Sequence, residues 1–167
     1  MADIKLRAPE PVDIDTLFIW ENDSSQWISS LTPVHVSRQR IWDYVNNFDG
    51  DIGVWQQIKL MVCNEGETLG SVDLFDIDLR TLHAFVGIFI AQEFRGKGFG
   101  AESLRQICDY AFNVLGLKSL CAVVAVNNVP ALHIFGVTGF SEVGILHDWL
   151  RNGQSLEDAS LLQLVSR

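Results

Sequence analysis

The sequence has few cysteines and no cluster of side chains suited to a metal. Its three cysteines, Cys63, Cys108 and Cys121, are odd in number and widely spaced, so they form neither a disulfide framework nor a metal or redox motif. All three lie among apolar residues, which predicts core packing in a reducing cytoplasm. Because no grouping of His, Asp and Glu has metal-ligand spacing, we also predict that the protein binds no metal.

Positive charge is scarce as well. Twelve Lys and Arg residues face 21 Asp and Glu residues, which gives a net charge of −9, and no basic run offsets this excess. A nucleic-acid partner is therefore not expected, because phosphate binding depends on clustered basic residues. The acidic balance fits a cationic substrate, such as a small amine or a basic peptide, and it equally fits a role in solubility alone.

Long hydrophobic runs are missing. The longest apolar stretch is far below the roughly 20 residues of a membrane helix, and the N-terminal MADIKLR has no signal-peptide apolar region. We therefore expect no membrane anchoring and a cytoplasmic location. The chain does contain the material for a core, since 48% of its residues are hydrophobic, with five Trp and ten Phe. Its length predicts one domain spanning residues 1–167.

Strand and helix patterns alternate along the chain, with hairpins near both ends. Apolar periodicity predicts strands at 4–7, 55–63, 69–77, 83–91, 120–126, 143–150 and 156–165, and helices near 12–20, 37–48, 101–115 and 128–137. This order predicts an α/β fold in a single domain. We expect a mixed, mostly antiparallel sheet of about seven strands with flanking helices.

The segment from residue 83 to residue 116 carries the functional argument. An apolar strand pattern leads into the glycine-rich run from Arg95 to Gly100, and helical spacing follows from Ala101. Glycines permit backbone conformations that side chains forbid, and unpaired amides at a helix start attract anions. Arg95 and Lys97 add positive charge at the same place. The sequence therefore predicts a phosphate-binding turn.

Two common phosphate-binding patterns fit this turn less well. A P-loop needs Ser or Thr after its lysine, but Gly98 follows Lys97. The dinucleotide pattern G-x-G-x-x-A is matched by Gly96, Gly98 and Ala101, yet it should bring an acidic residue about 20 positions later. The next predicted strand ends instead in two asparagines. Dinucleotide binding therefore stays open as the weaker alternative.

The run from Arg95 to Gly100 resembles the Q/R-x-x-G-x-G/A signature of the GCN5-related N-acetyltransferase (GNAT) family. The N-x-x-A-x-x-I-F block that begins at Asn128, with the Gly-Phe pair after it, resembles the next conserved block of that family. The resemblance covers nearly the whole chain and is strongest to the branch with spermidine and ribosomal-protein N-terminal acetyltransferases. It implies the GNAT acyltransferase fold, acetyl-CoA as co-substrate and an amine as acceptor.

The resemblance also implies which residues hold the cofactor. Amides of the glycine turn would bind the pyrophosphate, and a backbone amide among Ile88, Phe89 and Ile90 would meet the thioester carbonyl. Asn128 would hydrogen-bond the cofactor, although an Asn at a helix start is otherwise a cap. The implied cofactor-binding residues are Phe89, Ile90, Arg95, Gly96, Lys97, Gly98, Phe99, Gly100, Asn128 and Phe135.

Two positions depart from the family pattern. Phe135 stands where the family usually has a Tyr as general acid, and Phe85 stands where many members have a Glu as base. Neither phenyl ring can transfer a proton. The candidate catalytic residues that remain are His83, which shares a strand face with Phe85, and Asp73, with Asp76 as a further acidic candidate. The alternative for His83 is a surface position at a strand end.

The loop after the first helix borders the acceptor site in the resembling branch, which makes Glu21, Asp23 and Trp27 candidates for that site. An ordinary exposed loop is the alternative. Two functions follow from these observations. The chain is either an N-acetyltransferase acting on a primary amine, such as a polyamine or a peptide N-terminus, or a catalytically weak or inactive CoA-binding module. A homo-oligomer with two-fold symmetry is the default expectation.

Overall fold

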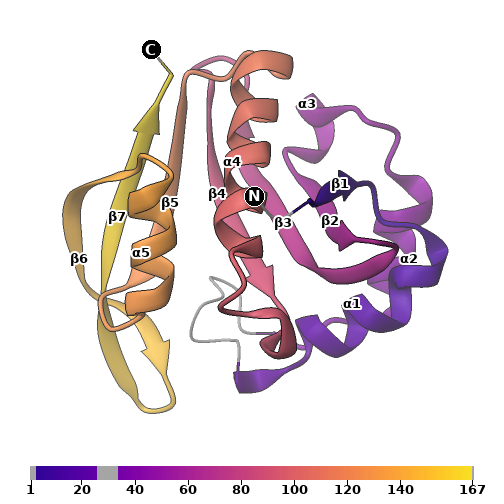
Figure 1. The fold of residues 1–167 in the computed structure, drawn as a ribbon, viewed down its shortest axis with the longest axis horizontal. Helices are drawn as coiled ribbons and strands as arrows, with labels where there is room; N and C mark the ends of the chain where they lie inside the picture. The colour runs from indigo at the N-terminus through magenta and orange to yellow at the C-terminus, as the bar shows by residue number, and fades with distance from the viewer. Residues whose placement is uncertain (1–2, 26–33, 167) are drawn as a thin grey trace.

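A computed structural model describes residues 3–25 and 34–166. The described residues contain seven strands that form one sheet in the order β1-β2-β3-β4-β5-β7-β6 (Figure 1). Neighbouring strands are antiparallel, except for β4 and β5, which are parallel. This arrangement confirms the predicted mixed α/β sheet. The strands are β1 (Lys5–Arg7), β2 (Ile58–Asn64), β3 (Glu67–Asp78), β4 (His83–Ile90), β5 (Ser119–Ala125), β6 (Ser141–Asn152) and β7 (Ser155–Val165).

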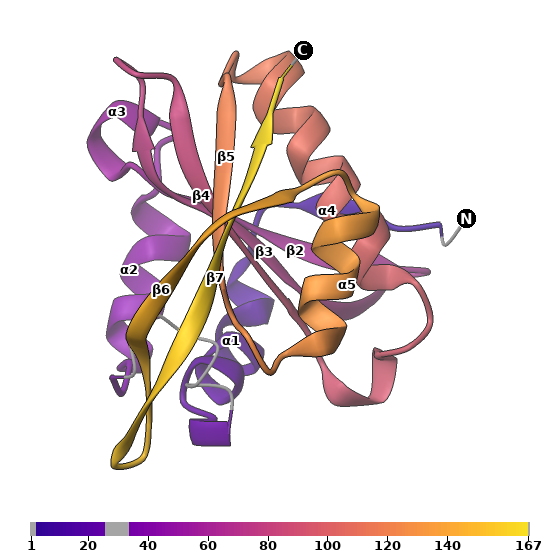
Figure 2. The same ribbon diagram turned by 90° about the vertical axis from the view of Figure 1, so that its left-hand side faces the viewer.

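Helices cover both faces of this sheet. Figure 2 shows α4 and α5 on one side of the sheet, with α1 and α2 on the other. None of the described helices is long and apolar enough to cross a membrane. The α-helices are α1 (Ile14–Glu21), α2 (Arg38–Asn47), α3 (Ile52–Trp55), α4 (Phe99–Asp109) and α5 (Val129–Val137), and the shorter turns are η1 (Pro11–Asp13), η3 (Gln92–Phe94) and the π-helical η4 (Tyr110–Val114).

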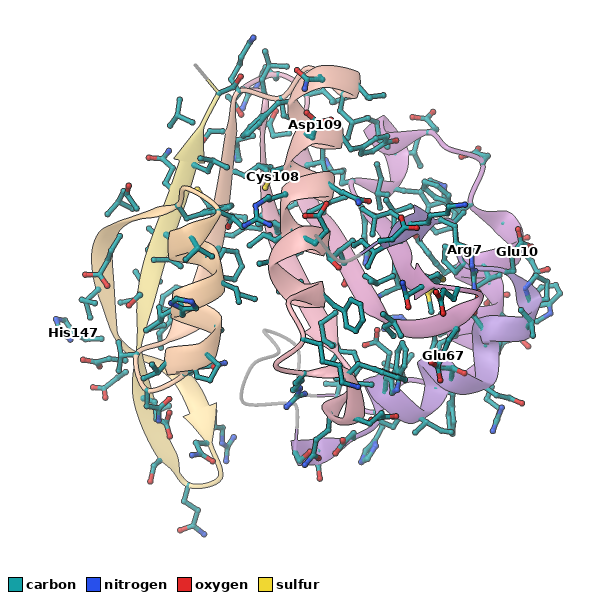
Figure 3. All side chains as sticks on the ribbon, viewed as in Figure 1. Arg7, Glu10, Glu67, Cys108, Asp109 and His147 are labelled. Carbon is teal, nitrogen blue, oxygen red and sulfur yellow. The ribbon has the colours of Figure 1, made fainter. Side chains whose placement is uncertain are left out.

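The main core lies between α4 and the sheet. Leu104 and Ile107 repeat at helical spacing on α4, and both are fully buried against strand residues such as Val72 and Leu74. Cys108 is also buried there, and its side chain points inward from α4 (Figure 3). Because side chains alternate along a strand, residues between Val72 and Leu74 face the opposite side of the sheet. That second face carries the polar residues of the candidate site.

A smaller cluster joins α1 and α2 to this second face. Leu17 of α1, Ile41 of α2 and Met61 of β2 are buried together. The side chain of Ser37 accepts a hydrogen bond from the Arg40 amide at 3.1 Å, which confirms the predicted cap of α2. The two helices are therefore anchored on β2, next to the strands that form the site.

The first predicted hairpin begins later than expected. Trp55 lies at the end of the short helix α3, and β2 starts only at Ile58. The Asp51 carboxylate caps α3 by accepting hydrogen bonds from the amides of Gly53 and Val54. A single capped turn is too short to produce a helical pattern of apolar residues, so no periodic signal marks it in the sequence.

The pairing between β4 and β5 is short. The two strands pair over only three positions, and the last pair is Phe85 with Cys121. Beyond it, β4 continues to Ile90 alongside β3, and β5 continues to Ala125 alongside β7. In Figure 1 the two strands lie side by side near the top of the view and separate below. We call this break in backbone pairing, between residues 86–90 of β4 and 122–125 of β5, the split.

Candidate active site

The glycine turn, residues 95–100, connects the open end of β4 to α4. Gly96 and Gly98 have φ angles of 74° and 84°, in the left-handed region that side chains disfavour. Among the described residues, no heavy atom lies within 4 Å of the place that a Cβ would occupy at either glycine. Gly98 is the N-cap of α4, and no described side chain caps this helix end. The first amides of α4 therefore have no described side chain as cap and are suited to an anion.

The start of α4 is held close to both β4 and α5. A Cβ placed on Gly100 would lie 3.4 Å from Ile134 of α5, 3.7 Å from Ile90 and 3.9 Å from Ile88. Because glycine has no side chain, the helix end approaches both elements without pushing them apart. The amides of the turn thus lie at the open end of the split.

Two basic residues belong to the turn. The Arg95 Nε atom donates a hydrogen bond to the Ile90 carbonyl at 2.8 Å, and its guanidinium lies 6.0 Å from the centre of the Phe89 ring. The Lys97 ammonium lies 5.6 Å from the centre of the Phe94 ring. Both cationic groups are therefore positioned at the turn, as the sequence predicted, and they add positive charge beside the exposed amides.

The amides of β4 alternate between β3 and the split. The Ala91 amide donates to the Leu69 carbonyl at 2.9 Å, on the β3 side. In an antiparallel pair every second residue repeats this direction, so the Phe89 amide also faces β3. The amides of Ile88 and Ile90 then face the split. Of the three residues expected to offer an amide to a thioester carbonyl, the geometry favours Ile88 and Ile90.

Asn128 and Phe135 border the split from α5. The Asn128 side-chain oxygen accepts a hydrogen bond from the Ala131 amide at 3.2 Å, so it caps α5. This cap uses the oxygen and leaves the side-chain nitrogen as the group suited to donate to a cofactor. The Phe135 ring is only 3% exposed and packs edge-to-face on Phe140, with ring centres 5.0 Å apart. Phe135 is therefore part of the core as well as of the candidate site.

A polar row crosses the second face of the sheet and ends at the split. Lys59 of β2 lies opposite Asp73 of β3, which lies opposite Gly87 of β4. The Lys59 ammonium is 2.7 Å from the Asp73 carboxylate and 3.0 Å from Glu21 at the end of α1. A Cβ on Gly87 would lie 4.0 Å from the Asp73 Cβ. Asp73 is thus the carboxylate beside the strand that lines the split.

Burial and neighbouring charges both shift the pKa values of the residues in this row. Burial lowers the pKa of Lys59, but the neighbouring carboxylates of Asp73 and Glu21 outweigh it and raise that pKa above its usual value. Burial raises the pKa of Asp73 against the opposing effect of Lys59. The Asp73 Oδ1 atom is buried beside the ammonium without a well-directed hydrogen bond. Asp73 is therefore more basic than an ordinary aspartate, while Lys59 stays charged at neutral pH.

Aromatic rings flank this row on the same face. Phe75 and Phe85 stack with ring centres 5.7 Å apart, and Trp20 of α1 lies 5.0 Å from Phe89. Gly87 lies between Phe85 and Phe89 in the alternation of β4 and leaves a gap in the aromatic surface. The aromatic rings of Phe75, Phe85, Phe89 and Trp20 thus give this face an apolar surface beside the charged row, with Ser71 as a further buried polar residue opposite Phe89.

Other predicted catalytic residues lie farther from the open part of the split. His83 is the first residue of β4, where that strand is still paired with β5, and its Nδ1 atom is 2.6 Å from the Thr81 hydroxyl. At about 3.3 Å per residue it lies about 17 Å from Ile88 along the strand. Asp76 is exposed at an irregularity of β3 and has a φ angle of 49°. Geometry thus brings Asp73, rather than His83 or Asp76, to the site.

The predicted acceptor loop is only partly described. Glu21 contacts Lys59 and so joins the polar row, whereas Asp23 is exposed and accepts a hydrogen bond from the Ser25 amide at 3.0 Å. Trp27 lies outside the described residues. Sequence reasoning did not find Lys59. The available signal was a single charged residue inside an apolar strand, since a lysine there needs a partner.

A hollow elsewhere on the molecule does not coincide with the glycine turn. It has a volume of about 560 Å³ and is lined by residues of β1, the second half of α4 and η4, including Arg7, Arg105 and Tyr110. This places it at the end of α4 away from Gly98. Within residues 3–25 and 34–166, no group of three or more His, Cys, Asp or Glu side chains is arranged to hold a metal ion.

Comparison with known proteins identifies the family. Residues 3–141 match the family model described as an acetyltransferase (GNAT) domain. The chain belongs to the GNAT acetyltransferase family. It is 29% identical to the spermidine N(1)-acetyltransferase of Escherichia coli over 155 residues, which cover 90% of this chain and 80% of that protein.

Two solved structures extend this similarity to the fold. The spermidine N-acetyltransferase from Vibrio cholerae in complex with CoA and spermine has a TM-score of 0.87 at 25% identity, covering 97% of this chain and 95% of that one. A dodecameric structure of the enzyme from the same organism has a TM-score of 0.82 at 25% identity, with coverages of 97% and 93%. The GNAT fold predicted from the sequence is therefore confirmed.

Family membership also confirms the predicted chemistry. This GNAT protein is an acetyltransferase that uses acetyl-CoA and transfers the acetyl group to an amine.

Proposed function

We propose that this GNAT enzyme holds acetyl-CoA in the split and acetylates a small primary amine that approaches from the α1 side of the sheet. One observation carries the proposal: β4 and β5 stop pairing after Phe85, and the glycine turn with its exposed amides lies at the end of β4 where they are unpaired. A diphosphate bound at this turn would direct the attached thioester along β4 into the split.

The residues of the split supply binding and orientation. Amides from Gly96 to Gly100 would hold the pyrophosphate, aided by Arg95 and Lys97, and the Asn128 amide nitrogen would donate to the cofactor. The amide of Ile88 or Ile90 would hydrogen-bond the thioester oxygen and stabilise the negative charge that develops on it. The amine nitrogen then attacks the carbonyl carbon, the carbon–sulfur bond breaks, and CoA leaves as the thiol after it gains a proton.

The acceptor must lose a proton before or during this attack, because an alkylamine has a pKa of about 10. Asp73 is the residue we propose for this role, since it lies opposite Gly87 and burial raises its pKa. Neither Phe85 nor Phe135 is able to exchange a proton. Proximity and orientation account for roughly 7–11 kcal/mol of such a barrier, so the reaction proceeds without a dedicated acid.

Polyamines and peptide N-termini are the amine classes to test first, because the relatives include enzymes named for spermidine. A homo-oligomer is proposed on the same basis, since one similar structure is dodecameric. The described cysteines are all free, which fits the proposed cytoplasmic location.

Release of free CoA thiol tests the proposal. The protein is mixed with acetyl-CoA and a panel of spermidine, peptides with free N-termini and simple alkylamines, and calorimetry with CoA is run alongside. We expect CoA binding together with thiol release for at least one amine. Binding of CoA without thiol release from any amine would leave a CoA-binding module, and absence of CoA binding would remove the assignment of the split.

A further inference from the structure

Lys59 occupies an unusual place for a positive charge in an enzyme that binds amines. Its side chain is 13% exposed, and its ammonium lies between the carboxylates of Glu21 and Asp73 at 3.0 and 2.7 Å. The Lys59 backbone is fixed as well, since its amide donates to the Tyr44 hydroxyl at 2.8 Å. The cation is therefore a built-in part of the second face of the sheet.

The charge balance of this row limits what it attracts. Two carboxylates and one ammonium leave a single net negative charge beside the split. One such charge suits one incoming ammonium, whereas the same row without Lys59 would carry two negative charges and suit a diamine. A buried charge needs a partner of opposite sign, and the Lys59 ammonium already fills this role for the two carboxylates. A second cation of the acceptor therefore cannot bind at the position of this ammonium.

Distance supports the same interpretation. Lys59 and Gly87 are separated by β3 alone, so the two strands lie about 10 Å apart. The Lys59 ammonium spans this separation back to Asp73, at 2.7 Å, so a second acceptor cation in its place would share that carboxylate with the reacting nitrogen. The rest of the face near Gly87 is aromatic and suits an apolar chain, with Phe85 and Phe89 on either side.

We propose that Lys59 is a specificity-determining residue that occupies the second cation position of the acceptor site, so that the enzyme prefers amines with one positive charge and an apolar body over diamines and polyamines. This inference rests on the proposed function and narrows its acceptor class. The net charge of −9 attracts cations in general, and it does not by itself distinguish one ammonium from two.

Hexylamine and 1,6-diaminohexane form a matched pair that differs by one ammonium group. For the wild-type enzyme we expect kcat/KM to be about tenfold or more higher for hexylamine, because a charged partner is worth about one order of magnitude or more. Lys59→Met should shift the ratio of the two values by about tenfold or more towards the diamine. Lys59→Arg keeps the cation, and Lys118→Met removes an exposed lysine that directly precedes β5, so neither should change the ratio.

Each outcome decides the inference. A wild-type preference for 1,6-diaminohexane or spermidine would overturn it, and so would an unchanged ratio in Lys59→Met. If Lys59→Met fails to fold, the wild-type ratio still gives the answer. If no amine releases thiol, the proposed function fails. The role of Lys59 is then tested separately by calorimetry, which compares the affinities of the CoA-bound protein for the two amines. Equal or stronger binding of the diamine in that measurement would reject the role of Lys59.

Discussion

Phe135 bears on how the leaving thiolate would obtain its proton in the proposed site. The ring lies in the core against Phe140 and carries no group able to donate, so the proton would not come from this position. At pH 7 a thiol with an ordinary pKa near 8.5 is mostly protonated at equilibrium. Acetyl transfer therefore proceeds without a general acid, but at a lower rate.

Phe135→Tyr should raise turnover. A phenol at this position restores the family's general acid, and such groups contribute roughly 10²–10⁴-fold, so we expect kcat to rise by about tenfold or more with little change in CoA affinity. Steady-state thiol release and CoA calorimetry check the two quantities. Phe140→Tyr places the same hydroxyl on the neighbouring ring and serves as control. An equal rate for wild type and Phe135→Tyr would exclude Phe135 from the acid position.

Single residues of the site were unevenly predictable from the sequence. Asn128 was assigned to the cofactor through its motif. The structure shows the alternative role, the cap of α5, and the cofactor role stays a prediction that the free side-chain nitrogen permits. Asp73 was one of several acidic candidates, and its pairing with Gly87 and its ion pair with Lys59 distinguish it from the exposed Asp76. Lys59 was missed because its partners come from α1 and β3, which are distant in sequence.

At the scale of elements, the strand, glycine turn and helix were predicted almost to the residue. The predicted strand at 83–91 is β4 (His83–Ile90), and the predicted helix became α4 followed by η4. Glycine positions and apolar spacing are local signals, and local structure decides these boundaries. The order of β6 and β7 at the sheet edge was not predicted, since it depends on how a hairpin docks on β5.

The glycine turn should lose its ligand when it carries a negative charge. Gly98 has a φ angle of 84°, which Asn and Asp both tolerate better than most residues. Gly98→Asn therefore measures the effect of added volume, and Gly98→Asp adds charge at nearly the same volume. We expect Gly98→Asp to bind CoA at least about tenfold more weakly than Gly98→Asn, by calorimetry. Equal affinities would show that the phosphates bind elsewhere.

At the scale of the whole molecule, an ion pair connects the first strand to the first helix. Arg7 donates to both oxygens of Asp13 at 2.6 and 2.9 Å, and the Glu10 amide donates to the same carboxylate at 2.8 Å. Arg7 and Glu10 lie close together in Figure 3. Burial raises the pKa of Asp13, but the bonds from Arg7 and Glu10 outweigh it and hold that pKa below its usual value.

This pair predicts a pH-dependent stability. Because the pKa of Asp13 is lower in the folded state, its carboxylate stabilises the fold above pH 4 or so, and the effect is lost as pH falls through the folded pKa. Asp13→Asn should lower the free energy of unfolding by about 2 kcal/mol at pH 7 and by less at pH 3, measured with urea.

The matched control is Asp15→Asn. Asp15 also pairs with an arginine, Arg38, but both side chains are mostly exposed, so its loss should change stability by less than about 1 kcal/mol. If Asp13→Asn is no more destabilising than this control at pH 7, the buried ion pair does not stabilise the fold.

The overall architecture was accessible from the sequence, and the second face of the sheet was not. Alternating strands and helices were enough to predict the α/β sheet, because each pattern marks its own element. The row from Lys59 to Gly87 depends on the register of three strands. A shift of one residue would turn Asp73 towards α4, and no local pattern fixes that register.

The short pairing of β4 with β5 has a consequence for how such a protein diversifies. Past Phe85 and Cys121 no ladder of backbone hydrogen bonds sets the spacing of the two strands, and side chains such as Ile88 and Ile134 set it instead. A single mutation replaces a side chain, whereas it does not remove a ladder of backbone hydrogen bonds. If the split holds the acyl group as proposed, its width is an adjustable dimension, and we expect a few substitutions to admit longer or shorter acyl donors while the scaffold stays the same.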